Sequence, residues 1–197
     1  MHITYPNLLT LLRLGLALPI ALLLSMEDAW AVWSGAGLFA VAALTDSADG
    51  WIARRYGQST LEGAFLDPLA DKLVVLAVLG ALLWWRVAPG WMVAILLLRD
   101  VATTLLRWYS LRRGEPVRTL PSARVKTFVQ MLGLVFLVVL LALWRSGAAP
   151  HAQWAQELLF GWVAWSLLLG MTLLALWTLG LYGWRYRALW LRRLPVE

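Results

Sequence analysis

The sequence of 197 residues contains no cysteine and only two histidines, His2 and His151. The absence of cysteine excludes disulfides, thiolate nucleophiles and thiolate-bound metals. His2 lies at the start of the sequence and His151 follows Pro150 in an expected polar turn, so both are interpreted as solvated bystanders. Acid–base chemistry in this chain therefore falls to carboxylates or lysine.

Charged residues are also scarce, at 14% of the chain against 61% hydrophobic residues and a mean hydropathy of +0.72. A soluble domain typically carries about 25% charged residues. The apolar runs are long enough to cross a bilayer several times. The composition predicts an all-α, polytopic membrane protein with a single domain over residues 1–197. The net charge of +6 is assigned to the flanks of membrane spans near anionic lipid, because no basic-aromatic motif for nucleic acid is visible.

Six transmembrane helices are expected, over residues 8–26, 29–56, 61–86, 90–113, 122–145 and 154–189. Of the 17 Lys and Arg residues, only Arg86 and Arg145 lie near the expected outer turns. The positive-inside rule therefore places both termini on the cytoplasmic side. Arg13 is expected to reach that interface, and Trp84 and Trp85 are expected to anchor the opposite one.

Four aspartates stand at the edges of these apolar runs, which is a costly place for negative charge. Asp46 and Asp49 share a face near the end of the second expected helix, and Asp67 and Asp71 are one turn apart on the third. A short turn between the helices makes them antiparallel neighbours, so the two pairs can face each other. Four close carboxylates repel unless a cation sits among them. Oxygen ligands without His or Cys favour Mg²⁺, Mn²⁺ or Ca²⁺.

The residues around these aspartates are small or suited to phosphate. Gly50, Ala53 and Gly63 leave room for a ligand to approach the backbone, and Arg54 offers a planar fork for phosphate. Together with the metal ions they indicate a pyrophosphate substrate bridged by divalent cations. The competing interpretation is a polar patch held by ion pairs with nearby basic residues such as Lys72, which neutralise four acids less well than metal ions do.

A second cationic group is expected close to this site. Arg99, Thr103 and Arg107 share one stripe of the fourth expected helix, and Arg99 lies deep enough that it should face a polar cavity, with Asp100 as a candidate structural partner. Arg124 and Lys126 belong to the basic segment 112–126, which opens on the same cytoplasmic face. Such a group suits a phosphorylated acceptor and not a neutral amine alcohol. The competing interpretation of the basic segment is a flank that binds anionic lipid.

The pattern D-x2-D-G-x2-A-R-x8-G-x3-D-x3-D runs from Asp46 to Asp71 and is matched at every fixed position. It resembles the signature of the CDP-alcohol phosphatidyltransferase family. The resemblance implies a homodimer that moves a phosphatidyl group from CDP-diacylglycerol to an alcohol and releases CMP. It implies two Mg²⁺ or Mn²⁺ ions on Asp46, Asp49, Asp67 and Asp71, with Asp71 also taking the acceptor proton. The residues implied for CDP-diacylglycerol are Asn7, Gly50, Ala53, Arg54, Thr60 and Gly63.

The segment from Ser122 to Thr127, and Arg99-Asp100 with Arg107, resemble the branch of that family whose acceptor is sn-glycerol 3-phosphate. This implies a bacterial inner-membrane enzyme that binds the acceptor phosphate through Arg99, Arg107, Arg124 and Lys126. Ala123 and Arg124 stand where many members of that branch have Gly and Lys. Inositol phosphate, phosphatidylglycerol and serine remain alternative acceptors. A small cation transporter is an alternative of another class, but it would need broken helices and a site at the midplane.

Overall fold

The structure is a computed structural model that describes the backbone of residues 5–56, 61–112, 121–147 and 150–187. Within these ranges, the side chains of residues 5–11, 46–56, 61–71, 107, 111–112 and 121 lie outside the described part. The described residues form seven helices and no strand, which confirms the all-α prediction. The helices are α1 (Tyr5–Leu24), α2 (Ala29–Tyr56), α3 (Leu61–Trp84), α4 (Gly90–Arg112), α5 (Pro121–Arg145), α6 (His151–Phe160) and α7 (Trp162–Arg185).

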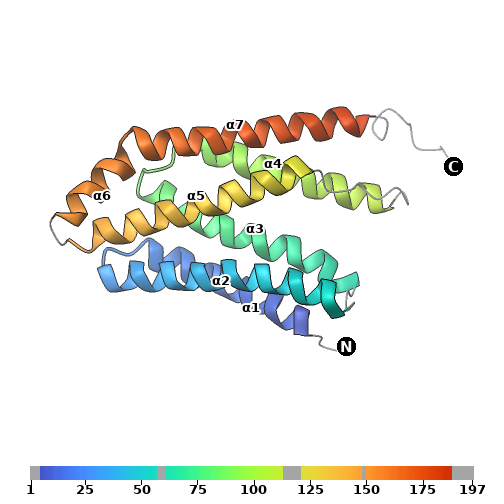
Figure 1. The fold of residues 1–197 in the computed structure, drawn as a ribbon, viewed down its shortest axis with the longest axis horizontal. Coiled ribbons are helices and arrows are strands. Elements are labelled where there is room, and N and C mark those ends of the chain that lie inside the picture. Colours follow the sequence, from blue (N-terminus) through green and yellow to red (C-terminus); the bar gives the residue numbers. More distant parts are fainter. Residues whose placement is uncertain (1–4, 57–60, 113–120, 148–149, 188–197) are drawn as a thin grey trace.

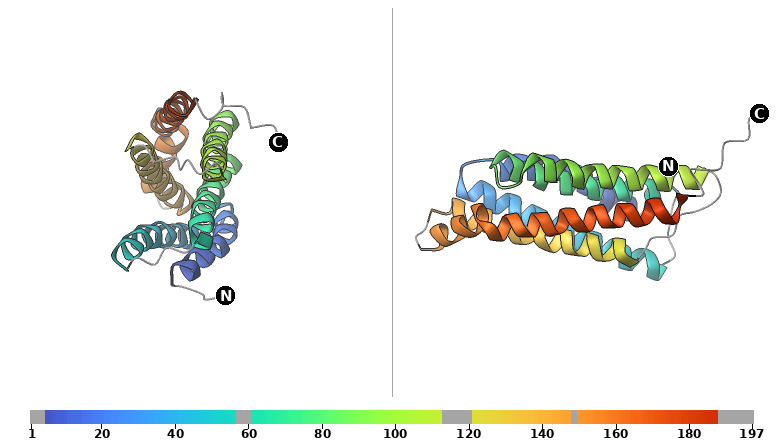
Figure 2. Two further views of the ribbon diagram at one scale, coloured as in Figure 1. Left: turned by 90° about the vertical axis from the view of Figure 1, so that its right-hand side faces the viewer. Right: turned by 90° about the horizontal axis from the view of Figure 1, so that it is seen from above.

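The helices form one elongated bundle (Figures 1 and 2). Helix α1 packs against both α2 and α3, while α7 packs against α4 and α5. Contacts between α2 and α5 join these two groups. The start of α1 and the ends of α2, α4 and α7 all lie toward one end of the bundle (Figure 1). The expected functional segments are therefore gathered at one end, which we call the site end.

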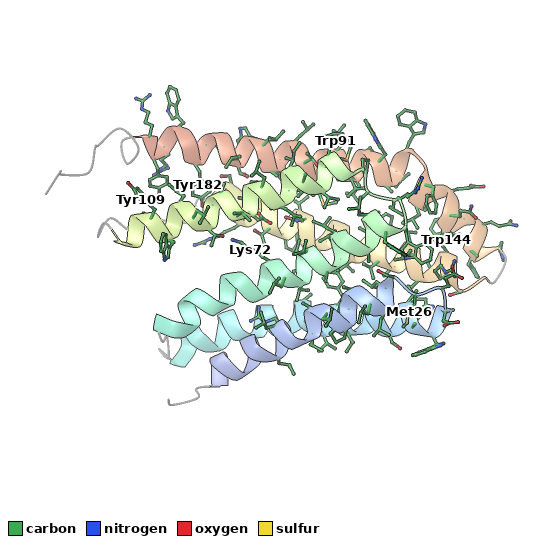
Figure 3. The ribbon with its side chains drawn as sticks, turned by 180° about the vertical axis from the view of Figure 1, so that it is seen from behind. Met26, Lys72, Trp91, Tyr109, Trp144 and Tyr182 are labelled. Carbon is green, nitrogen blue, oxygen red and sulfur yellow. The ribbon has the colours of Figure 1, made fainter. Side chains whose placement is uncertain are left out.

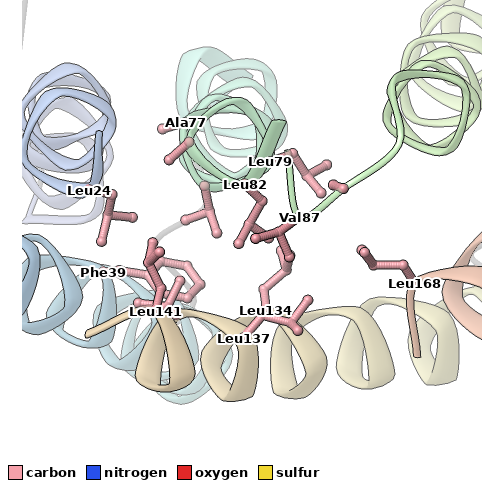
Figure 4. Packing of buried hydrophobic residues seen from close by; sticks show 14 of the residues in the cluster. Leu24, Phe39, Ala77, Leu79, Leu82, Val87, Leu134, Leu137, Leu141 and Leu168 are labelled. Atoms are coloured by element: carbon pink, nitrogen blue, oxygen red, sulfur yellow. The ribbon is translucent and has the colours of Figure 1, made fainter. Parts of the chain in front are cut away.

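Two clusters of buried apolar side chains are formed by the described residues: a large one to which all seven helices contribute, and a small one of Leu106, Ala123 and Tyr182. Leu24, Phe39, Leu82, Leu137 and Leu168 come from five helices and are all almost completely buried (Figure 4). The buried polar side chains of the described residues include those of Arg13, Arg99, Lys126, Gln130 and Thr178. Because buried polar groups must be paired or serve a ligand, these side chains are candidates for a functional role.

The turn between α3 and α4 contains a residue with a left-handed backbone conformation. Arg86 has a φ of 58°, and it is the non-glycine residue with positive φ among the described ones. The backbone N–H groups of Val87 and Ala88 both donate to the carbonyl of Leu82, at 2.9 and 3.1 Å. This closure satisfies a carbonyl at the end of α3 and reverses the chain, but a side chain in the left-handed region costs about 1 kcal/mol.

The expected boundaries agree with the first five helices to within three residues, and α2 matches exactly. The last expected helix is wrong, because it is divided into α6 and α7 at Gly161. Gly161 adopts φ −95° and ψ −166°, and a Cβ there would overlap the carbonyl oxygen of Glu157. A residue without a side chain thus permits the bend. Because α3 begins at Leu61, Pro68 lies inside the helix and not in its first turn.

At the end of the bundle opposite the site end, Arg145 of α5 contacts residues of the neighbouring turns. Its guanidinium donates hydrogen bonds to the carbonyl of Glu27 and lies over the rings of Trp85 and Trp144, 4.8 and 5.3 Å from their centroids. The indole N–H of Trp85 donates to the carbonyl of Leu24 at 2.8 Å. Trp84 is exposed as an interface anchor should be, whereas Trp85 ties α3 to the end of α1. These bonds fix the turns that join the helices at this end.

Arg13 does not reach the surface as expected, since only 2% of the residue is exposed. Its position in the middle of α1, which packs on both α2 and α3, encloses the long side chain within the bundle. Two helical stretches of the described residues, Ser122–Arg145 and Trp162–Arg185, are long and apolar enough to cross a membrane. Three shorter apolar stretches lie in α1, α2 and α3.

Candidate functional site

The four aspartates lie on the helical hairpin formed by α2 and α3. Asp46 and Asp49 belong to the second half of α2, and Asp67 and Asp71 belong to the first half of α3. The end of α2 and the beginning of α3 lie together at the site end (Figure 1). The backbone therefore places the two pairs of positions toward one end of one hairpin. Their side chains lie outside the described part, so the ligand geometry stays a prediction.

The other residues implied for the nucleotide lie on or beside the same hairpin. Gly50, Ala53 and Arg54 follow the first aspartate pair on α2, and Gly63 precedes the second pair on α3. Asn7 lies in the first turn of α1, which packs on both helices. Thr60 falls in the 57–60 link, outside the described residues, and the side chains of the other five are likewise outside them.

A divalent cation fits this set of donors by its chemistry. Asp46, Asp49, Asp67 and Asp71 would supply hard carboxylate oxygens from two neighbouring helices, as Mg²⁺ and Mn²⁺ prefer. Where side chains are described, no group of three or more His, Asp or Glu residues could hold a metal. The side chains of the four aspartates lie outside this described part, which holds no competing metal site.

The second cationic group is centred on Asp100 in α4. Oδ1 of Asp100 lies 2.8 Å from Nη1 of Arg99 and 2.7 Å from Nζ of Lys126 on α5. Arg99 also donates from Nε to the hydroxyl of Thr178 on α7 at 3.2 Å. The exposed fractions of Arg99 and Lys126 are only 6% and 2%. The structure thus brings together two of the four residues predicted for the acceptor phosphate and confirms Asp100 as a partner of Arg99.

Lys72 joins this group to the aspartate hairpin. Its Nζ donates to the backbone carbonyl of Asp100 at 2.7 Å, and Figure 3 shows Lys72 between α3 and α4. Lys72 directly follows Asp71 in the sequence. A single residue therefore links the helix that carries Asp67 and Asp71 to the buried cations.

The other two residues predicted for the acceptor are placed differently. Arg124 is exposed on α5, because it lies two residues from Lys126 and so on another face of the helix. Arg107 lies two turns beyond Arg99 on α4, and its side chain is outside the described part. The structure supports Arg99 and Lys126 as the buried members of the group and gives Arg124 a peripheral position.

Two buried nitrogens in this region have no hydrogen-bond partner among the described residues. They are Nη2 of Arg99 and the amide Nε2 of Gln130. Gln130 lies one turn from Lys126 on the same face of α5. Sequence reasoning missed Gln130, although its spacing from Lys126 is a readable signal. It also missed Thr178, whose contact with Arg99 spans 79 residues and leaves no local signal. Buried donors without a protein partner are positions where a ligand can supply acceptors.

The sequence profile of the CDP-alcohol phosphatidyltransferase family matches residues 3–177. That range includes both the aspartate hairpin and the buried cations. The chain belongs to this family, which confirms the resemblance read from the pattern between Asp46 and Asp71. The family is one of enzymes, and membership therefore favours a transferase over the small cation transporter.

Among curated proteins, the chain is similar to the CDP-diacylglycerol–glycerol-3-phosphate 3-phosphatidyltransferases of Salmonella choleraesuis (strain SC-B67) and Escherichia coli (strain K12). The identity to each is 36% over 152 residues, which cover 74% of this chain and 79% of the relative. Both relatives carry names that specify glycerol 3-phosphate as the acceptor.

Proposed function

We propose that the chain transfers the phosphatidyl group of CDP-diacylglycerol to sn-glycerol 3-phosphate and releases CMP, in a reaction that depends on Mg²⁺ or Mn²⁺. Family membership and the names of the relatives support the reaction class and the acceptor. The observation that supports glycerol 3-phosphate as the acceptor is the buried group of Arg99, Lys126 and Asp100, which Lys72 joins to the aspartate hairpin. It holds more positive than negative charge, as a site for a phosphorylated alcohol requires.

The hydroxyl oxygen of the acceptor attacks the phosphorus that bears diacylglycerol, and the bond from that phosphorus to the oxygen of CMP breaks. Asp71 accepts the hydroxyl proton, and CMP leaves with the bridging oxygen. Asp46, Asp49, Asp67 and Asp71 would hold two metal ions, which stabilise negative charge on the phosphates when bound. Arg54 binds a phosphate of the nucleotide, and Gly50, Ala53 and Gly63 give the nucleotide room. Arg99 and Lys126 orient the acceptor by its phosphate.

We further propose that the helices α1 to α5 and α7 cross the bacterial inner membrane. They contain 20 to 28 residues each, so even the shortest is about 30 Å long, the thickness of the hydrocarbon core. The distribution of Lys and Arg orients the site end and both termini toward the cytoplasm. That is where a water-soluble nucleotide and glycerol 3-phosphate are available. Family resemblance supports a homodimer.

The test is CMP release by the purified full chain in detergent with CDP-diacylglycerol and Mg²⁺ or Mn²⁺. Glycerol 3-phosphate, inositol 1-phosphate, serine and phosphatidylglycerol are supplied in separate reactions. We expect release with glycerol 3-phosphate and none with the other three. An Asp67→Asn variant serves as the control for contaminating enzymes. Release with a different acceptor would preserve the phosphatidyl transfer and overturn the acceptor, while no release by protein that binds CDP would overturn both.

A further inference from the structure

Asp100 occupies a junction of four helices. Its carboxylate binds Arg99 of the same helix and Lys126 of α5, and its backbone carbonyl accepts a hydrogen bond from Lys72 of α3. Through Arg99 the same group reaches Thr178 of α7. Both side-chain bonds end on a single atom, Oδ1. The side chain and the backbone of Asp100 thus hold different partners, and a change of side chain leaves the carbonyl that Lys72 binds in place.

The shared oxygen also sets how far apart the two cations lie. Since Nη1 of Arg99 and Nζ of Lys126 are 2.8 and 2.7 Å from Oδ1, these two nitrogens are at most about 5.5 Å apart. Two donors at such a separation can both bond to one phosphate group, whose oxygens accept strongly from cations. Nη2 of Arg99 is buried without a partner among the described residues, so it has capacity for a ligand.

The charge of the group is one unit positive, because two cations share one carboxylate. Without that carboxylate, two buried cations would repel each other and lose the atom that fixes their side chains. With it, they are neutralised in part and keep their spacing before any ligand arrives. Such preorganisation lowers the free-energy cost of ordering these side chains when the substrate binds.

We propose that Asp100 is a positioning residue for the acceptor phosphate. It acts through Arg99 and Lys126 and touches no substrate itself. This inference rests on the proposed function, since it takes glycerol 3-phosphate as the acceptor. It predicts different effects on the binding of the two substrates. The side chain of Asp100 orients the cations for the acceptor phosphate, while the nucleotide binds at the aspartate hairpin.

The first test is Asp100→Asn, which keeps the shape of the side chain and removes its charge. CMP release is measured against glycerol 3-phosphate at saturating CDP-diacylglycerol, and then with the two substrates exchanged. We expect the KM for glycerol 3-phosphate to rise at least tenfold and the KM for CDP-diacylglycerol to stay within twofold. Thr172→Val is the matched control, since among the described residues this buried hydroxyl on α7 bonds within its own helix, to the carbonyl of Leu168. It should change neither KM.

A double-mutant cycle distinguishes positioning from a general loss of structure. Lys126→Met alone should raise the KM for the acceptor, and adding Asp100→Asn should raise it less than threefold further, because one of the two cations that Asp100 positions is already gone. The positioning role would be overturned if the double variant raised the acceptor KM by the product of the two single effects. Equal changes in kcat and in both KM values would overturn it as well. So would an unchanged acceptor KM in Asp100→Asn.

If Asp100→Asn does not fold, Asp100→Glu provides the same test, because it keeps the charge and displaces the oxygen by one methylene. Its acceptor KM should rise, and an unchanged value would overturn the inference. Failure of the proposed function gives a different result. In that case the unmodified chain itself releases no CMP with glycerol 3-phosphate, whatever residue stands at position 100.

Discussion

Replacing Lys126 by methionine tests whether a buried cation binds the acceptor. The lysine is 2% exposed and its Nζ lies 2.7 Å from Oδ1 of Asp100. Methionine fills a similar space without charge, and Asp100 keeps its bond to Arg99. The protein should therefore fold, because the substitution leaves no buried carboxylate without a partner.

The magnitude follows from the bond that the phosphate would lose. A hydrogen bond between charged groups contributes about 1.5–3 kcal/mol, and each 1.4 kcal/mol corresponds to about a tenfold change in an equilibrium constant. The KM for glycerol 3-phosphate should rise roughly 10- to 100-fold in Lys126→Met, while the KM for CDP-diacylglycerol changes less than threefold. The assay is CMP release at varied acceptor and saturating CDP-diacylglycerol.

Arg124→Met provides the matched control on the same helix. It removes the same charge two residues away, from a side chain that is exposed. Its effect on the acceptor KM should be less than threefold. Equal effects of the two substitutions would mean that only the overall charge of the region matters. No effect of Lys126→Met would remove this lysine from the acceptor site and refute the reasoning.

Other residues lead to separate expectations. Asp71→Asn should abolish CMP release while CDP still binds in a calorimetric titration, and near-normal turnover would exclude it as the base. Removal of divalent ions with EDTA should stop release, Mg²⁺ or Mn²⁺ should restore it, and activity that survives chelation would contradict the metal site. Arg86→Gly should raise the free energy of unfolding by about 1 kcal/mol in thermal denaturation, because glycine adopts φ 58° without strain; a lower midpoint would refute this. Gly161→Ala should lower the midpoint, since its Cβ would overlap the carbonyl of Glu157.

Much of the fold could be predicted because apolar runs and turn residues are local signals. The expected range 29–56 coincides with α2, and the expected range 122–145 differs from α5 by one residue. The break at Gly161 could not be predicted in this way, because the flanking residues are apolar and a lone glycine is also tolerated inside a helix. Arg13 was misplaced for a related reason, since its burial depends on how α1 packs against its neighbours.

The candidate site shows the same division between local and distant information. The aspartate positions could be located because the pattern between Asp46 and Asp71 lies within one hairpin. The partner of Lys126 could not be read from the sequence, because Asp100 lies 26 residues away on another helix. The contact between Arg99 and Thr178 is more distant still. Spacing identifies residues of one helix face, whereas pairing across helices depends on the packing of the bundle.

The most direct test of the central claim is a competition experiment. The full chain receives CDP-diacylglycerol, Mg²⁺ and equal concentrations of glycerol 3-phosphate, inositol 1-phosphate, serine and phosphatidylglycerol, and the lipid products are resolved by mass spectrometry. We expect one new product, phosphatidylglycerol phosphate, in amounts equal to the CMP released, and its absence in Asp67→Asn. A product that carries inositol phosphate, serine or a second phosphatidyl group would contradict the assignment of the acceptor to the buried cations.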